Sequence, residues 1–361
     1  MIRNALDVIP FVTVKGILIP NEKDKEKLLL LMRRFTWACR RATNILWKGF
    51  KSKEAHKSAY EVLKDYVYAE SAIKHAKLIL KGAKVNDGKP YRKQRRIYLI
   101  SRGSKWEKHG NRNVKILRGN DFFRIRVKYP FDEKNRWIEG TADFGVFNPI
   151  VEELAMLAER NLDGYSVKII FSGNFYIHVS VPVELYLKYT KIGSVEVFRF
   201  AGFDVNSDRC NMVILDENGR MVCHKTAWFS QVVQHGYPRG RAWNEIVSEV
   251  DKLFRIAKGY SVKTLFFEDL FVINGKRVVS GSSAKSRRRC SRFLKSKLLN
   301  WMILRGLKHC FYVYLVDPTK TSVAGEVIGK RLGFDKHTAS AYAIALRGIN
   351  ALKCLRTSIK T

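Results

Sequence analysis

The spacing of hydrophobic residues changes along the chain, and it predicts three kinds of structure in turn. Residues 8–18 alternate between apolar and polar positions and are rich in β-branched side chains, which is typical of a strand. After Pro20, apolar residues from Leu28 to Ile45 recur at three- and four-residue steps, which predicts one long amphipathic helix. Residues 54–81 continue the helical pattern and predict further helices.

Between about residues 95 and 190 the hydrophobic period becomes two, with glycine and asparagine at the turns. This pattern predicts an antiparallel β region. The strand at 8–18 is expected to join that region, so the predicted helices between them form an insertion.

The last part of the chain predicts a mixed α/β domain. Three strands are expected first, with a tight turn at Asp216–Gly219 between the second and the third. Helices and strands then alternate, and this order is that of an RNase H-like fold built on a mixed sheet. The strands are expected at residues 198–205, 210–215, 221–228, 262–268 and 310–316. One helix is expected at about 241–258, a second ends at about 309, and the last begins at Asp335.

Three acidic residues stand at comparable positions of this last domain. Asp204 lies near the end of its first strand, Glu268 ends its fourth strand, and Asp335 precedes its final helix. The first and fourth strands of an RNase H-like sheet are neighbours, so Asp204 and Glu268 are expected to meet. Two Mg²⁺ ions about 3.5–4 Å apart, held by carboxylates, can activate a water and stabilise the leaving oxygen in phosphodiester hydrolysis. The three acids are our candidate catalytic and metal-binding residues, with Mg²⁺ or Mn²⁺ as the cofactor.

Each of these acids also has a structural interpretation. An aspartate after a strand is most often a turn former, and Asp335 suits a helix N-cap, a role that it can combine with metal binding. Asp269 directly follows Glu268 and is an alternative ligand in its place. Asp208 is a candidate turn residue.

The charge of the chain points to a polyanionic partner. The 361 residues include 67 Lys and Arg against 33 Asp and Glu, which gives a formal net charge of +34 and a pI of about 10.0. A protein this basic attracts phosphate backbones, and basic residues spread along its whole length suit a long ligand. Any single basic run is more often a solvated surface.

The six cysteines are scattered, without a Cys-x-x-Cys pair or a Cys/His spacing suited to zinc. They are expected to be reduced. The sequence contains no secretory signal and no apolar run long enough to span a bilayer, so we expect a cytoplasmic protein without a structural zinc.

Four stretches resemble the RuvC-like nuclease core of TnpB proteins, which are RNA-guided nucleases of insertion sequences and relatives of type V CRISPR effectors. They are Gly202-Phe-Asp204, Glu268-Asp-Leu270, Val316-Asp-Pro-Thr-Lys-Thr-Ser322 and Asp335-Lys-His-Thr-Ala339. The resemblance covers nearly the whole chain and is strongest from residue 200 to residue 350.

The resemblance implies a RuvC-like nuclease domain at residues 196–361, preceded by a wedge-like β barrel with an inserted helical recognition domain. The barrel would comprise residues 1–22 and 96–195, and the helical domain residues 23–95. The protein would bind a guide RNA and, through it, a DNA target, with the sequence read by base pairing and the duplex held by shape and charge.

The same resemblance implies which residues contact nucleic acid. Trp37 and Trp47 are candidates for base stacking, although aromatic residues at helical spacing more often lie in a core. Phosphate contacts are expected from a basic helix and from a basic run in the last domain. These residues are Arg33, Arg34, Arg40, Arg41, Lys285, Arg287, Arg288 and Arg289.

Two departures separate this sequence from typical TnpB members. Those members carry a four-cysteine zinc ribbon between the Thr-Ser segment and the last aspartate, where this sequence has only Val323–Phe334. His337 and Thr338 stand where Asn and Ala are usual. The sequence is therefore identified as a member of a divergent, TnpB-related branch.

The leading prediction is an RNA-guided DNA endonuclease that uses Mg²⁺ and the three acids. The first alternative is an RNA-guided DNA-binding protein that does not cut, such as a repressor or a transposon accessory factor. The second is a guide-free nuclease of the resolvase type, which needs little beyond the RNase H-like core and leaves the large basic N-terminal half unexplained. Retention of all three acids favours the nuclease.

Overall fold

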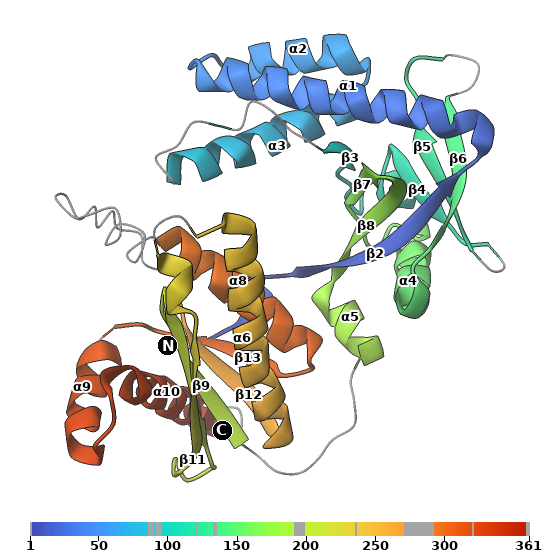
Figure 1. Cartoon of the computed structure of the whole chain (residues 1–361). Coiled ribbons are helices and arrows are strands. Elements are labelled where there is room, and N and C mark those ends of the chain that lie inside the picture. The colour runs from blue at the N-terminus through green and yellow to red at the C-terminus, as the bar shows by residue number, and fades with distance from the viewer. Residues whose placement is uncertain are drawn as a thin grey trace. The chain divides into compact units, whose positions relative to one another are not determined.

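The chain is divided into two compact units (Figure 1). We call residues 11–189 the N-terminal unit, and residues 1–10 together with 190–361 the C-terminal unit. The computed structural model describes residues 2–85, 90, 96–119, 122–132, 136–190, 199–234, 237–270, 292–319 and 321–358.

The N-terminal unit is built on a curled antiparallel sheet of seven strands. The predicted first strand is β2 (Phe11–Pro20), which lies in the middle of the sheet between β8 and β6. The other strands are β3 (Ile97–Ser101), β4 (Val114–Leu117), β5 (Phe123–Lys128), β6 (Trp137–Asp143), β7 (Val167–Ser172) and β8 (Asn174–Pro182). The order is β3-β7-β8-β2-β6-β5-β4, so within the described residues β3 and β4 are edge strands.

Three helices are inserted between β2 and β3, as the sequence predicts. They are α1 (Glu22–Trp47), α2 (Ser52–Leu63) and α3 (Tyr66–Val85). The apolar face of α1 is fully buried at Leu28, Met32 and Phe35, where it packs against the other two helices and β3. Across the part of the chain that the structure describes, no helix is both long and apolar enough to cross a bilayer.

Two helices of this unit differ from the prediction of a purely β region between residues 95 and 190. They are α4 (Asn148–Glu159) and α5 (Val183–Thr190). The buried residues of α4 include Ile150, Leu154 and Ala158, a four-residue repeat that is helical rather than β in period. Short 3₁₀ turns occur in this unit at η2 (Lys108–Gly110) and η3 (Gly145–Phe147). In the C-terminal unit they occur at η1 (Ala5–Asp7) and η4 (Ser230–Val233).

The C-terminal unit contains a mixed sheet of six strands. The five predicted strands are β9 (Arg199–Val205), β10 (Arg209–Leu215), β11 (Met221–Trp228), β12 (Val262–Glu268) and β13 (Tyr312–Val316). Their order is β13-β12-β9-β10-β11; β10 is antiparallel to its neighbours, and β12 is parallel to both of its own. The expectation that the first and fourth strands are neighbours is confirmed.

The sixth strand comes from the other end of the chain. β1 (Ile2–Asn4) pairs antiparallel with β13 at the edge of this sheet. The sequence-based boundaries place residues 1–22 with the β region, whereas residues 1–10 belong to the C-terminal unit. The reason is a long-range edge pairing of three residues, a length too short to leave a recognisable hydrophobic period.

Helices cover both faces of this sheet. α6 (Arg239–Gly259) and α8 (Arg292–Lys308) lie on one face, where the ring of Phe254 from α6 stacks on Phe203 at 5.7 Å. α10 (Lys336–Ser358) lies on the other face, and α9 (Thr321–Leu332) packs against it. The α10 face has a core that includes Phe200, Phe266 and Ile344.

Glycines allow α10 to approach the sheet closely. A Cβ atom at Gly202 of β9 would lie 2.3 Å from the backbone oxygen of Ala341 and 2.6 Å from the backbone nitrogen of Ala345. A Cβ atom at Gly348 of α10 would lie 2.3 Å from the ring of Phe266. These close approaches hold α10 against β9 and β12.

Candidate functional site

Asp204 and Glu268 lie at the same level of two neighbouring parallel strands. The register of β9 and β12 pairs Phe203 with Phe267, one residue before each acid. These two rings stack at 5.0 Å on the face that α6 and α8 cover. Because side chains alternate along a strand, Asp204 and Glu268 point to the opposite face, beneath the start of α10. The structure thus brings together the two acids that the sequence predicts to meet.

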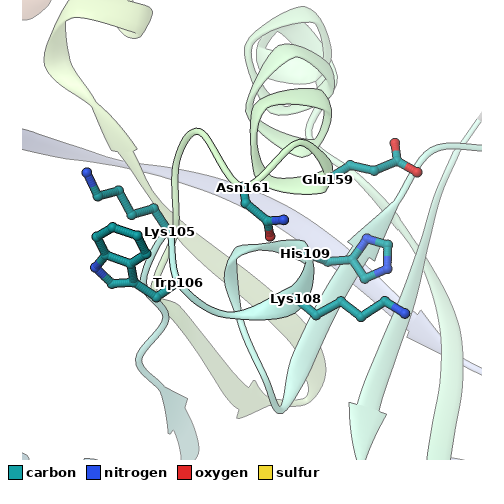
Figure 2. Close-up of a pocket in the computed structure, with 6 residues that line it drawn as sticks. All are labelled: Lys105, Trp106, Lys108, His109, Glu159 and Asn161. Atoms are coloured by element: carbon teal, nitrogen blue, oxygen red, sulfur yellow. The ribbon is translucent and has the colours of Figure 1, made fainter.

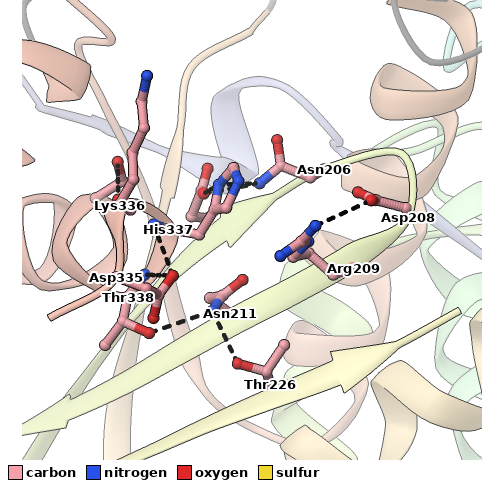
Figure 3. Close-up of polar contacts among 11 residues, drawn as sticks. Asn206, Asp208, Arg209, Asn211, Thr226, Asp335, Lys336, His337 and Thr338 are labelled. Carbon is pink, nitrogen blue, oxygen red and sulfur yellow. Dashed lines mark hydrogen bonds and ion pairs between the residues drawn. The ribbon is translucent and has the colours of Figure 1, made fainter. Parts of the chain in front are cut away.

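The first turn of α10 brings His337 against Asp204, and Figure 3 shows His337 and Asn206 pointing toward each other. Nδ1 of His337 lies 2.9 Å from Oδ2 of Asp204. The side-chain nitrogen of Asn206 donates to the same oxygen at 2.7 Å and lies 3.0 Å from His337 Nδ1. The side chains of Asp204 and His337 are 13% and 33% exposed, so this cluster sits at the rim of the core, where a ligand can reach it.

Asp335 caps the N-terminus of α10. Its Oδ1 accepts hydrogen bonds from the backbone N–H groups of His337 at 3.0 Å and Thr338 at 3.2 Å. Burial raises the pKa of Asp335, but hydrogen bonds from the Thr338 hydroxyl and from both N–H groups outweigh it, so the pKa lies below its ordinary value. The helix-cap interpretation is confirmed, and the carboxylate is ionised at neutral pH.

A chain of polar side chains ties this turn to the sheet (Figure 3). The amide nitrogen of Asn211 donates to the hydroxyl oxygens of Thr226 at 2.8 Å and Thr338 at 3.3 Å. Asn211 is paired with Asp204 in the β9–β10 register, so both point to the α10 face. The Oδ1 atom of Asn211 is buried without a hydrogen-bond partner, which leaves one free acceptor in the cluster.

The other acids near these strands have different partners. Asp269 is 4% exposed, and its carboxylate pairs with Nη1 of Arg3 from β1 at 3.3 Å. Asp269 therefore stabilises the pairing of β1 at the edge of the sheet, whereas the side chain of Glu268 lies on the α10 face. Asp208 lies in the β9–β10 turn, as its structural interpretation predicts, and pairs with Arg209 at 3.2 Å.

The described residues hold no ready-made metal cage. Among them, no three side chains of His, Cys, Asp or Glu converge in an arrangement that could hold a metal ion. Two carboxylates on adjacent strands and one imidazole are what the fold offers at this point. Such a cluster can bind a cation only together with water or with oxygens of a ligand.

The predicted phosphate-binding residues that the structure describes lie on α1. Arg33 is exposed, and the partly buried Arg34 and Arg41 lie over the rings of Phe131 and Trp37 at 4.0 and 5.0 Å. Arg40 is half-buried. The predictions for Lys285, Arg287, Arg288 and Arg289 fall outside the described residues.

The two tryptophans of α1 are not core residues. Trp37 is 50% exposed and Trp47 is 39% exposed, so the expectation that helical spacing places them in a core is wrong. The buried stripe of α1 includes instead Leu28, Leu29, Leu31, Met32, Phe35 and Cys39. Both indoles are exposed, and Arg41 lies over that of Trp37.

Sequence reasoning missed the polar partners of Asp204. Asn206 follows Asp204 by two residues. In the sequence, His337 stands out only as a departure from the Asn that is usual in TnpB proteins. A His in the first turn of a helix that also carries a candidate ligand was the available signal. Asn211 and Thr226 left none, because their role depends on strand register.

The fold and these residues define a two-unit α/β protein whose C-terminal unit has the strand order of an RNase H-like sheet, with acids at the ends of its central strands. Residues 11–191 match the family model described as the SSO2105 N-terminal domain. The chain is 35% identical over 366 residues to the uncharacterized protein SSO2105 of Saccharolobus solfataricus, covering 98% of this chain and 96% of that protein. The chain belongs to the SSO2105 family.

Further matches are partial or distant. An uncharacterized protein of Aeropyrum pernix is 33% identical over 185 residues, which is 48% of each chain. Among solved structures, Thermus thermophilus RuvC in complex with a Holliday junction substrate has a TM-score of 0.32 at 13% identity, covering 43% of this chain and 96% of that one. A Cas12f1–sgRNA–target DNA complex has a TM-score of 0.40 at 11% identity, covering 90% of this chain and 83% of that one.

Proposed function

We propose that this chain is an RNA-guided DNA endonuclease of the TnpB type, in which Asp204, Glu268 and Asp335 serve a divalent cation. The observation that carries the proposal is the juxtaposition of Asp204 and Glu268 on parallel neighbouring strands, under the helix that Asp335 caps. The net charge of +34 supports a nucleic acid as the substrate. Hydrolysis of a phosphodiester is the reaction that acids in this position suit.

The residues fit a hard cation such as Mg²⁺ or Mn²⁺. Mg²⁺ is usually held by one or two carboxylates with waters and substrate phosphates, so it needs no cage of three protein ligands. Asp204 and Glu268 would hold it, and Asp335, which caps α10 in the structure, would have to turn toward it to complete one side. When bound, the cation supplies the positive charge that activates water and stabilises the leaving oxygen.

The remaining polar residues hold this arrangement in place. Asn206 and His337 fix the carboxylate of Asp204 from two directions. The hydrogen bond from Asn211 to Thr338 ties the first turn of α10 to β10. Rigid support of this kind is needed because a carboxylate displaced by about 1 Å loses much of its catalytic value.

The contact between His337 and Asp204 gives the imidazole a part in metal binding. With its proton on Nε2, the imidazole of His337 would present the lone pair of Nδ1 beside Asp204, and a cation would displace the contact between Nδ1 and the side-chain nitrogen of Asn206. Nδ1 of His337 and Oδ2 of Asp204 are 2.9 Å apart, so the imidazole would join the carboxylate in holding a cation.

Replacement of His337 by alanine is therefore expected to change metal preference. Nitrogen donors favour Mn²⁺ over Mg²⁺, so Mn²⁺ affinity should fall about 10-fold while Mg²⁺ affinity changes much less. Isothermal titration calorimetry of the full chain with each ion measures both. His224→Ala, on the exposed surface of β11, is the matched control. Equal losses for the two ions would show that His337 only positions Asp204.

The alternative function is an RNA-guided DNA-binding protein that does not cut. One observation favours it: the Asp204 carboxylate already has His337 and Asn206 as partners, and Asp335 is engaged as a helix cap. If Nδ1 of His337 carries the proton, it donates to Asp204 and competes with a cation for the same oxygen.

The deciding experiment is to purify the chain with the RNA that accompanies it, to sequence that RNA, and to assay DNA matching its variable end. We expect one defined transcript and cutting only with Mg²⁺ or Mn²⁺. Tight binding of matched DNA without cutting at any metal concentration would establish the alternative. Cutting without any RNA would support the guide-free nuclease, the third candidate.

A further inference from the structure

The N-terminal unit carries a polar hollow of about 500 Å³ (Figure 2). Its position is defined by the loop after β3 and by the end of α4. Figure 2 shows Lys105 and Trp106 toward one end and Lys108 and His109 toward the other, with Asn161 between them. The lining residues are Lys105, Trp106, Lys108, His109, Glu159 and Asn161.

Trp106 is 85% exposed, which is far more than its size leads one to expect. The ammonium of Lys105 lies 4.9 Å from the centre of its ring, so the indole is paired with a cation rather than with apolar neighbours. An indole in this position contributes little to the stability of the fold. It is placed to meet a flat, electron-rich or aromatic ligand.

The loop that carries Trp106 is anchored at its end by Asn111, which is 0% exposed. Its Oδ1 accepts from the N–H groups of Asn113 and Val114 and from the Ser101 hydroxyl, at 3.1, 2.9 and 2.7 Å. Its amide nitrogen donates to the carbonyl oxygen of Tyr165 at 3.0 Å. The loop is therefore preorganised, and the exposed side chains stand on a fixed base.

Two of the lining residues adopt a left-handed backbone conformation without being glycine. His109 has a φ of 57° and Asn161 a φ of 56°. Asn161 ends α4 in this conformation, which is a common way for a helix to end, whereas His109 lies in the loop after β3, and such residues cluster at ligand-binding positions. Burial and the nearby charge of Lys115 lower the pKa of His109, so its imidazole is neutral at pH 7.

We propose that this hollow binds one unpaired nucleotide of a single-stranded nucleic acid, with its base stacked on Trp106 and its phosphates beside Lys105 and Lys108. Base stacking on an aromatic side chain beside lysines is the general way in which proteins hold single strands. A pocket of about 300–1,000 Å³ suits a ligand of this size. The inference goes beyond the carboxylate site and holds whether or not the chain cuts DNA.

The polar groups of the hollow select a base over a bare anion. Glu159 would repel an isolated phosphate but can accept a hydrogen bond from a base amino group. Asn161 can donate to and accept from a base edge. The pair of lysines alone would not need an exposed indole beside Lys105 and a carboxylate in the same hollow.

The test is binding of a labelled single strand of about 12 nucleotides to the full chain in EDTA, by fluorescence anisotropy, as RNA and as DNA of one sequence. Trp106→Ala should weaken binding of the favoured strand about 5- to 100-fold. Trp106→Phe, which keeps a stacking face, should lie within about 3-fold of wild type. Trp228→Ala removes an indole that is 53% exposed and has Arg209 over its ring at 4.1 Å, and it is the matched control.

Salt and duplex measurements separate stacking from charge. Trp106→Ala should leave the salt dependence unchanged, whereas Lys105→Ala and Lys108→Ala should each reduce its slope by about one unit. The affinity for duplex of the same sequence should be equal in the Trp106→Ala chain and in wild type. The proposal is overturned if Trp106→Ala binds single strands like wild type, if it loses single and double strands equally, or if the phenylalanine chain loses as much as the alanine chain. EDTA excludes metal-dependent cutting, so this outcome is independent of the proposed nuclease activity.

Discussion

Replacement of Asp204 by asparagine is expected to abolish DNA cutting and to leave binding of the co-purified RNA intact. The change keeps the shape of the side chain and removes the charge that a cation between β9 and β12 requires. We expect the single-turnover cutting rate to fall at least about 1,000-fold, because metal-assisted hydrolysis depends on several kcal/mol of charge stabilisation. RNA affinity, measured by filter binding, should stay within about 2-fold, since phosphate contacts carry it.

The matched control for this change is Asp208→Asn. Asp208 is another acid of the same turn region, and its partner is Arg209 rather than the α10 cluster. It should keep most of the cutting rate. If both variants cut equally well, Asp204 has no catalytic part and the metal site must be sought elsewhere. If Asp204→Asn also loses RNA, with a lower melting temperature, the carboxylate is a folding determinant.

Replacement of Gly202 by alanine is expected to destabilise the C-terminal unit by about 3 kcal/mol. The new methyl group would lie 2.3 Å from the backbone oxygen of Ala341, and a backbone atom of a packed helix cannot move aside cheaply. α10 must therefore shift from the sheet and carry His337 away from Asp204. Differential scanning calorimetry should show a lower transition for this unit, and cutting should fall with it.

Gly259→Ala provides the contrast to this prediction. Gly259 is the last residue of α6, and a Cβ atom there meets nothing within 4 Å. Removing a flexible glycine from a helix end should leave stability unchanged or raise it by up to about 1 kcal/mol. If the Gly202→Ala protein unfolds like wild type, the close approach of α10 to β9 is absent in solution.

The hydrophobic period predicted most of the elements that form the C-terminal sheet. β9, β12 and β13 are short and nearly continuous in apolar residues, and the turns that join β9, β10 and β11 carry asparagine, serine or glycine. α4 was missed although its apolar residues repeat at helical spacing, because the alternating strands on both sides dominated the interpretation of residues 95–190. β1 could not be found, since three residues have no period and their pairing partner lies at Tyr314–Val316.

The candidate site divides in the same way. Asp204 and Glu268 were predictable because a strand ending in an acid is visible in the sequence, and the strand order follows from the alternation of elements. The approach of His337 to Asp204 joins residues 133 positions apart and depends on how closely α10 packs. The hollow at Trp106 was also invisible, because the exposure of an indole is set by the loop that carries it.

The pairing of β1 with β13 also determines when the C-terminal unit can be completed during synthesis. Residues 1–10 are synthesised before the N-terminal unit, yet their partner strand β13 follows that unit, so the N-terminal unit is in effect an insertion within its neighbour. Domains fold as units while the chain grows, so residues 11–189 can fold before residues 1–10 have their partner strand. A fragment that begins near residue 190 would lack this strand and the Arg3–Asp269 ion pair. It would leave β13 as an unpaired edge strand, which promotes aggregation. Attempts to isolate the candidate nuclease domain should therefore keep the first ten residues, joined to it by a linker.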